Sequence, residues 1–120
     1  MSEKEMFTPH FSVDEMRCKC GCGAAKMDMS FMAALERTRE IAGIPFVVTS
    51  GFRCAKHNLA VGSTSTNHTR GVAADIKCVD GPSRLRIIEA ALRSGIKRIG
   101  LDKAFIHLDT NDGPASVWFY

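Results

Sequence analysis

Two stretches with the apolar spacing of a helix, each followed by a glycine, constrain the fold of this chain more than any other feature. Within residues 30–42, apolar side chains recur at steps of three and four, and charged side chains occupy the opposite face. The same spacing returns in residues 82–94, and Gly43 and Gly95 are typical helix stops. The sequence therefore predicts two amphipathic helices. The expected apolar face of the second helix consists of Leu85, Ile88, Ala91 and Leu92.

Short runs of β-branched and aromatic residues surround these helices and are typical of strands. Two of them, at residues 46–50 and 72–78, lie on either side of a long polar stretch. Two more, at residues 99–101 and 105–109, follow the second helix, and residues 118–120 are expected to add a short terminal strand. Helices and strands in this order predict an α+β fold, in which two helices lie on one side of a small, mostly antiparallel sheet.

The remaining segments predict a helical turn and two loops. Ser12 can cap a short helix because Glu15 follows three residues later, which is the spacing of a capping box. Residues 17–23 are rich in glycine and cysteine and favour a loop. Residues 51–70 are polar and predict a long loop with a helical turn near His57. Loops longer than about 12–15 residues in compact domains are usually functional, so binding or catalysis is expected there.

Length and charge exclude several classes of protein. The chain has 120 residues, which predicts a single domain spanning residues 1–120 that acts as a monomer. It contains no apolar run of about 18 residues, so neither a membrane span nor a membrane partner is expected. The net charge is +3, and basic residues are spread along the sequence without the clustered stripe of a nucleic-acid binder. The polar, acid-containing start lacks a signal peptide and predicts synthesis in the cytoplasm.

Three residues far apart in the sequence could share a metal ion. His68 ends the long loop, Asp75 lies on the strand after Gly71, and His107 lies on a separate strand. Two imidazoles and one carboxylate are good zinc ligands and leave a fourth position open for water, as in catalytic zinc sites. Spacing alone leaves an alternative open, in which His68 and Asp75 only form a hydrogen bond that anchors the loop.

Catalysis at such a site would require further groups. Zinc lowers the pKa of a coordinated water to about 7, and a nearby carboxylate must accept its proton. Asp109, two residues after His107 on the same strand face, is the first candidate base, and Asp102 is the second. Arg53 follows a strand, and its planar guanidinium suits an oxyanion or a substrate carboxylate.

Three motifs in order resemble one family. They are T-S-G-F-R at residues 49–53, T-x-H-x-x-G-x-x-A-D at residues 66–75, and F-I-H-L-D at residues 105–109, with Trp118 after them. Together they resemble the zinc D-alanyl-D-alanine carboxypeptidase superfamily, which includes murein endopeptidases, phage endolysins, vancomycin-resistance dipeptidases and the hedgehog signalling domain. The resemblance extends over residues 11–118.

The resemblance implies a hedgehog-like or D,D-peptidase-like fold and a Zn²⁺ ion on His68, Asp75 and His107. It also implies hydrolysis of peptide bonds in the stem peptides of peptidoglycan, by a D,D-carboxypeptidase or endopeptidase such as a phage endolysin. Such an enzyme would act on the cell wall after release from the cytoplasm, or from within a virion. Arg53, with Ser50 and Thr66 of the matching motifs, would bind substrate.

The sequence departs from the family at two positions. Thr66 replaces the usual serine, and Ala104 stands where many members carry the catalytic acid, three residues before the last ligand. Asp109 and Asp102 therefore remain alternative bases. If neither serves, the chain is a non-catalytic metal-binding module of a virion or a recognition domain; a third alternative is a dipeptidase acting on free D-Ala-D-Ala.

The five cysteines cannot all pair within one chain. Cys18, Cys20 and Cys22 are spaced differently from the C-x2-4-C pattern of zinc knuckles, which leaves free thiols and a second metal site as alternatives.

Overall fold

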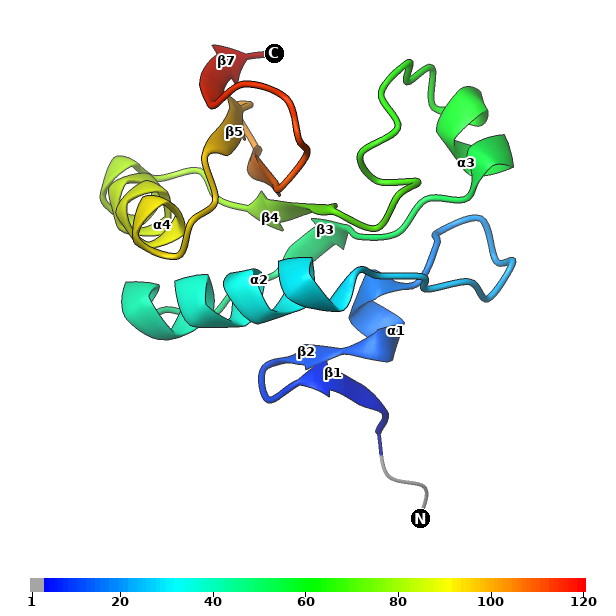
Figure 1. The fold of residues 1–120 in the computed structure, drawn as a ribbon, viewed down its shortest axis with the longest axis horizontal. Helices are drawn as coiled ribbons and strands as arrows, with labels where there is room; N and C mark the ends of the chain where they lie inside the picture. The colour runs from blue at the N-terminus through cyan, green and yellow to red at the C-terminus, as the bar shows by residue number, and fades with distance from the viewer. Residues whose placement is uncertain (1–3) are drawn as a thin grey trace.

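The computed structural model describes residues 4–120, and within that range the chain forms an α+β fold (Figure 1). Its elements in chain order are β1 (Met6–Thr8), β2 (Phe11–Ser12), α1 (Val13–Met16), α2 (Met29–Ala42), β3 (Val48–Ser50), α3 (Ala55–Ala60), β4 (Ala73–Lys77), α4 (Gly81–Arg93), β5 (Arg98–Leu101), β6 (Phe105–Asp109) and β7 (Ser116–Phe119). The two long predicted helices are α2 and α4, and the predicted turn near His57 is α3. The predicted α+β class is confirmed, while the likeness to the hedgehog fold stays a prediction.

The central sheet has the strand order β3-β4-β6-β5-β7. Neighbouring strands are antiparallel except β5 and β7, which run parallel, so the sheet is mixed. The parallel pair arises because the chain leaves β6, passes the start of β5 and adds β7 at its outer edge, where Ser116 lies beside Arg98. A separate two-stranded hairpin, β1–β2, was absent from the predicted elements.

The two faces of the sheet differ sharply because side chains alternate along each strand. On one face, Ile76, Ile99, Ile106 and Leu108 are buried against α2 and α4. On the other face, the same strands present the polar residues of the candidate site. Burying each large apolar side chain contributes roughly 1.5–3 kcal/mol, so the helix-covered face stabilises the strands that carry the chemistry.

Helices α2 and α4 lie side by side over the apolar face (Figure 1). Phe31 and Leu35 of α2 and Ile87 of α4 are almost fully buried there. The predicted apolar face of α4 was partly wrong. Leu85 and Leu92 are exposed, and the helix instead buries Ile87, Ala90 and Ala91. The reason is that α4 packs against α2, and its Ile87–Ala91 side joins the core cluster that also contains the apolar residues of the sheet.

Side-chain caps fix where the helices begin. Asp28 accepts a hydrogen bond from the Phe31 amide at the start of α2, and Asp80 accepts one from Ser83 at the start of α4. Ser12 and Glu15 form the predicted capping box of α1.

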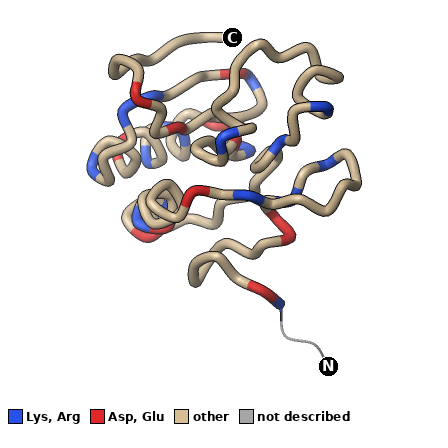
Figure 2. Tube along the Cα trace, turned by 45° about the vertical axis from the view of Figure 1, so that its right-hand side comes forward, with Lys and Arg blue, Asp and Glu red and all other residues tan. Residues whose placement is uncertain are grey.

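Acidic and basic residues are interspersed along the chain (Figure 2). Among residues 4–120, none of the helices combines the length and apolar character needed to cross a membrane.

Candidate active site

The structure brings the three predicted metal ligands together on the polar face of the sheet. Asp75 and His107 are direct partners in the β4–β6 pairing, and His107 Nδ1 lies 2.9 Å from Asp75 Oδ1. His68 Nε2 lies 3.4 Å from the same oxygen. One ligand atom from each residue falls within 4.8 Å of the others, and all three side chains are buried. Strand register therefore positions two of the ligands, and a loop supplies the third.

The turn that delivers His68 depends on Gly71. Gly71 has a φ of +72°, and a Cβ built there would lie 2.2 Å from the Lys26 carbonyl oxygen. The Gly71 amide donates to the His68 carbonyl, and the Gly71 carbonyl accepts from the Asp28 amide at 2.9 Å. Only glycine fits this backbone conformation and this close contact. The loop is thereby pressed against the segment before α2 and returns into β4.

The outer nitrogen of each imidazole is also engaged. His68 Nδ1 lies 2.8 Å from the Gly51 carbonyl oxygen, and His107 Nε2 lies 2.7 Å from Asp109 Oδ2. A carbonyl oxygen can only accept, so His68 Nδ1 donates to Gly51, and Nε2 faces Asp75. Metal-binding histidines typically have such an outer partner, which fixes the tautomer and orients the ring.

Electrostatics favour opposite charges on these groups in the metal-free protein. Burial raises the pKa of Asp75, but hydrogen bonds from His107 and His68 outweigh it and lower the pKa to about 2. Burial lowers the pKa of His107, yet its bonds to Asp109 and Asp75 raise the pKa above the ordinary value. The proton on His107 thus occupies the place that a metal ion would take, and binding would release it. Two imidazoles and a carboxylate at these separations fit Zn²⁺.

Asp109 lies beneath the ligands, not in open contact with the cleft. Its side chain is fully buried. Its oxygens accept hydrogen bonds from His107, Arg98 Nε at 2.8 Å, Asn67 Nδ2 at 3.3 Å and the Asn111 amide at 3.0 Å. Burial raises the pKa of Asp109, but the His107 and Asn111 hydrogen bonds and the Arg98 charge outweigh it and lower the pKa. Asp109 is therefore an ionised partner of His107 with four donors.

The ligands line a cleft of about 540 Å³. Arg53 is on its wall, 3.9 Å from Asp75 Oδ2, and is held by hydrogen bonds to Ser50 Oγ and Asn58 Oδ1. Trp118 and Tyr120 line the cleft from the β7 side, with ring centroids 5.5 and 6.4 Å from the His107 ring. The cleft thus combines the candidate metal ligands, the cations Arg53 and Arg98, and an aromatic wall.

Comparison with known proteins identifies the family. The family model described as Peptidase M15 matches residues 9–109, which include all three candidate ligands. The chain belongs to the peptidase M15 family. This confirms the predicted resemblance to the zinc D-alanyl-D-alanine carboxypeptidase superfamily and supports a metallopeptidase. No curated protein matches the chain in sequence.

Two other predicted site residues of this M15 family member, Asp102 and Thr66, do not line the cleft. Asp102 Oδ2 accepts the Ala104 amide at 2.9 Å, and Asp102 lines a separate depression beside Arg84 and Lys103. Thr66 is exposed and does not line the cleft. Ser50, in contrast, is paired with Asp75 in the β3–β4 register, and its hydroxyl accepts a hydrogen bond from Arg53.

Sequence reasoning missed two residues of the M15 site. Arg98, opposite Asp109 in the β5–β6 pairing, binds Asp109 and lies 5.3 Å from the centre of the Trp118 ring. Asn67, next to His68, donates to Asp109. The position of Asn67 beside a ligand was a usable signal, whereas the role of Arg98 depends on a strand pairing that the sequence does not reveal.

Proposed function

We propose that this M15 family member hydrolyses peptide bonds in the stem peptides of bacterial peptidoglycan, as a D,D-carboxypeptidase or endopeptidase. The supporting observation is the convergence of His68, Asp75 and His107 in a cleft that also contains Arg53. The family supports the peptidase class, and the motifs shared with the D-alanyl-D-alanine carboxypeptidases support the wall substrate. A phage endolysin that reaches the wall after release, or a virion-borne enzyme, is the setting that we propose.

His68, Asp75 and His107 would hold the zinc ion. Zinc, when bound, would act as a Lewis acid that polarises the scissile carbonyl and activates the attacking water. The carbonyl of Gly51 and the carboxylate of Asp109 would keep the two imidazoles oriented through the reaction. Because each imidazole already has such a partner, binding of the metal would require little reorientation of the two rings.

Arg53 would bind the substrate carboxylate or the developing oxyanion. Its hydrogen-bond partners, Ser50 and Asn58, are neutral, and its nearest carboxylate is Asp75 at 3.9 Å. The guanidinium charge is therefore incompletely neutralised, unlike that of Arg98, which is 2.8 Å from Asp109. Arg53 is also the arginine of the T-S-G-F-R motif. A bidentate contact with a terminal carboxylate would favour carboxypeptidase action.

We propose that Asp109 serves the reaction as a positioning residue acting through His107. Four donors occupy its oxygens, and its side chain has no exposed surface. To take the proton of water directly, Asp109 would have to give up one of these donors. The alternative base, Asp102, would have to leave the Ala104 amide and reach a different cavity. These contacts favour Asp109 over Asp102.

One observation favours the non-catalytic alternative. Among residues 4–120, Asp75 is the one carboxylate that lines the cleft, so a free acid for proton transfer is absent there. A metal-binding recognition module of a virion would need the three ligands but no such acid. The two functions differ in turnover, not in metal content.

Zymography on purified peptidoglycan, with and without a chelator, tests the proposal. Clearing that the chelator abolishes and zinc restores is the expected result, and His107→Ala is the matched inactive control. Mass analysis of the products would separate release of terminal D-alanine from cleavage within the stem peptide or of free D-Ala-D-Ala. Zinc bound in stoichiometric amount, with no product from any of these substrates, would establish the non-catalytic module instead.

A further inference from the structure

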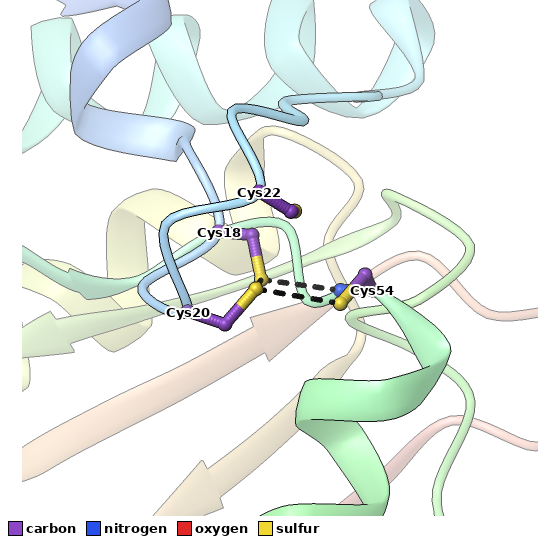
Figure 3. Close-up of side chains that lie close together, drawn as sticks. All are labelled: Cys18, Cys20, Cys22 and Cys54. Carbon is purple, nitrogen blue, oxygen red and sulfur yellow. Dashed lines mark hydrogen bonds between the residues drawn. The ribbon is translucent and has the colours of Figure 1, made fainter.

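A second cluster of metal-binding side chains lies outside the cleft. Four of the five cysteines gather where the loop after α1 meets the start of α3 (Figure 3). Cys18, Cys20 and Cys22 come from the loop, and Cys54 is the N-cap residue of α3. The five cysteines all lie among the described residues, and all are free thiols. The cysteine motif of residues 18–22 supplies three of these residues, and the fourth, Cys54, lies far from it in the sequence.

The separations of the sulfur atoms fit a common metal ion. Four thiolates around tetrahedral zinc, each at 2.3 Å, are about 3.8 Å apart. In the structure, Cys18 Sγ lies 3.4 Å from Cys20 Sγ, and Cys20 Sγ lies 3.6 Å from Cys54 Sγ. The Sγ atoms of all four cysteines lie within 4.8 Å of one another. The largest sulfur–sulfur separation therefore exceeds the tetrahedral value by at most about 1 Å.

Groups around the sulfurs suit thiolates. The Cys54 amide donates to Cys18 Sγ and the His57 amide donates to Cys54 Sγ, each at 3.4 Å. Hydrogen bonds from backbone amides stabilise anionic ligands and orient them. Lys56 lines the same surface depression as Cys20, Cys22 and Cys54, so it places a positive charge near a centre with four negative ligands.

The loop is shaped for this convergence. Gly21 and Gly23 have φ values of +89° and +83°, and they alternate with the cysteines. These conformations turn the loop back so that the Cys18 amide bonds the Ala24 carbonyl at 2.8 Å. Cys20 and Cys22 are exposed. Exposed free thiols are a liability that proteins usually avoid, whereas coordination would protect them.

We propose that Cys18, Cys20, Cys22 and Cys54 bind a zinc ion as a closed structural site, separate from the ion of the cleft. The ion would tie the loop after α1 to the start of α3. Arg53 directly precedes Cys54, and its amide donates to the His68 carbonyl at 3.3 Å. The second ion would thus also brace the wall of the cleft. The site depends on its own four sulfurs and requires no peptidase activity.

Metal analysis of the full-length protein, purified with zinc under reducing conditions, tests this site. Two zinc ions per chain are expected for the wild type. His107→Ala should retain one ion, and Cys20→Ser with Cys22→Ser should lose one. Cys78→Ser is the matched control, because Cys78 is the buried cysteine outside the cluster, and it should retain two. One ion in the wild type and none in His107→Ala would overturn the proposal.

Cobalt substitution covers the case in which the cysteine variants fail to fold. It uses the His107→Ala chain, which keeps all four thiols and has an impaired cleft site. Bound Co²⁺ should give the thiolate-to-metal charge-transfer absorption of tetrahedral sulfur ligands. A cobalt spectrum without thiolate bands, or a stable disulfide among these cysteines in protein prepared with zinc and reductant, would refute the site. Neither result depends on peptide hydrolysis, so a failed peptidase proposal would remain distinguishable.

Discussion

The two candidate metal sites differ in what holds their ligands in place. In the cleft, Asp75 and His107 lie on neighbouring strands in direct register, and a hydrogen bond fixes the outer nitrogen of each imidazole. In the cysteine cluster, three ligands belong to a loop turned by two glycines. Packed strands position side chains before an ion arrives, whereas loop-borne ligands gain order from the ion itself. The cleft site should therefore be preformed and the cluster metal-dependent.

Removing a proposed ligand of the cleft is the most direct test of the difference between the two sites. His107→Ala should lose the cleft ion and all detectable hydrolysis, because two remaining ligands cannot hold zinc in a catalytic geometry. Metal analysis and product release from peptidoglycan measure the two effects. Residual hydrolysis above a few per cent of wild type would mean that other residues hold the active metal.

The strand framework behind the cleft can be weakened without touching a ligand. Ile106, beside His107 in β6, is fully buried on the helix-covered face. Ile106→Ala should lower the free energy of unfolding by about 2–5 kcal/mol through the lost burial and the cavity left behind. Denaturant unfolding measures it. Leu85→Ala is the matched control on an exposed site and should change stability by under about 0.5 kcal/mol. Equal losses in the two variants would contradict the core described above.

Asp109→Asn separates positioning from direct proton transfer. If Asp109 acts through His107, the variant should bind zinc in the cleft roughly 10–100-fold more weakly, as expected when an outer partner of a metal ligand is lost. Competition with a zinc chelator measures this affinity. Wild-type affinity combined with lost turnover would instead assign Asp109 as the base. Asp102→Asn is the control, and we expect it to leave both quantities near wild type.

The smallest expected effect is a dependence of stability on pH. In the metal-free protein, the lowered pKa of Asp75, about 2, stabilises the fold above roughly pH 4, and this contribution is lost as the pH falls toward 2. The raised pKa of His107 stabilises the fold below roughly pH 6.5, and this contribution is lost as the pH rises through the folded value. Zinc binding requires unprotonated His107, so its stabilisation grows with pH.

Thermal unfolding with and without zinc checks this opposition. From about pH 6 to about pH 8, the melting temperature of the metal-free protein should fall by a few degrees. The increase in melting temperature caused by zinc should become larger over the same range. Asp75→Asn should flatten the metal-free trend, since it removes one partner of His107. If the increase in melting temperature caused by zinc became smaller over this range, a proton and the metal would not compete for His107.

The sequence predicted those parts of the fold that depend on local spacing. Helices α2 and α4 and the strands that carry Asp75 and His107 were predicted from periodicity and glycine stops. The buried face of α4 was predicted only in part, because apolar residues lie on two sides of that helix and its neighbours decide which side is covered. The parallel pairing of β5 with β7 was also missed, since spacing within a strand does not encode the direction of its partner.

The candidate site likewise contains some residues that local sequence patterns predicted and others that only the tertiary fold reveals. The three proposed metal ligands lie in recognisable motifs, and the alternation along residues 105–109 predicted that His107 and Asp109 share one face. The role of Arg98 requires the β5–β6 register, and Cys54 joins the other cysteines only through the tertiary fold. Contacts between segments that are distant in the sequence could therefore not be predicted from it.

The tight contact at Gly71 has a consequence for engineering. The backbone of Gly71 packs against Lys26 and Asp28, so the turn that carries His68 depends on the segment that leads into α2. A chimera that transplants residues 66–75 into another scaffold should misplace His68 unless residues 26–28 travel with them. The unit that a chimera must carry therefore consists of two segments that are separate in the gene, although the motif that marks it is short and continuous.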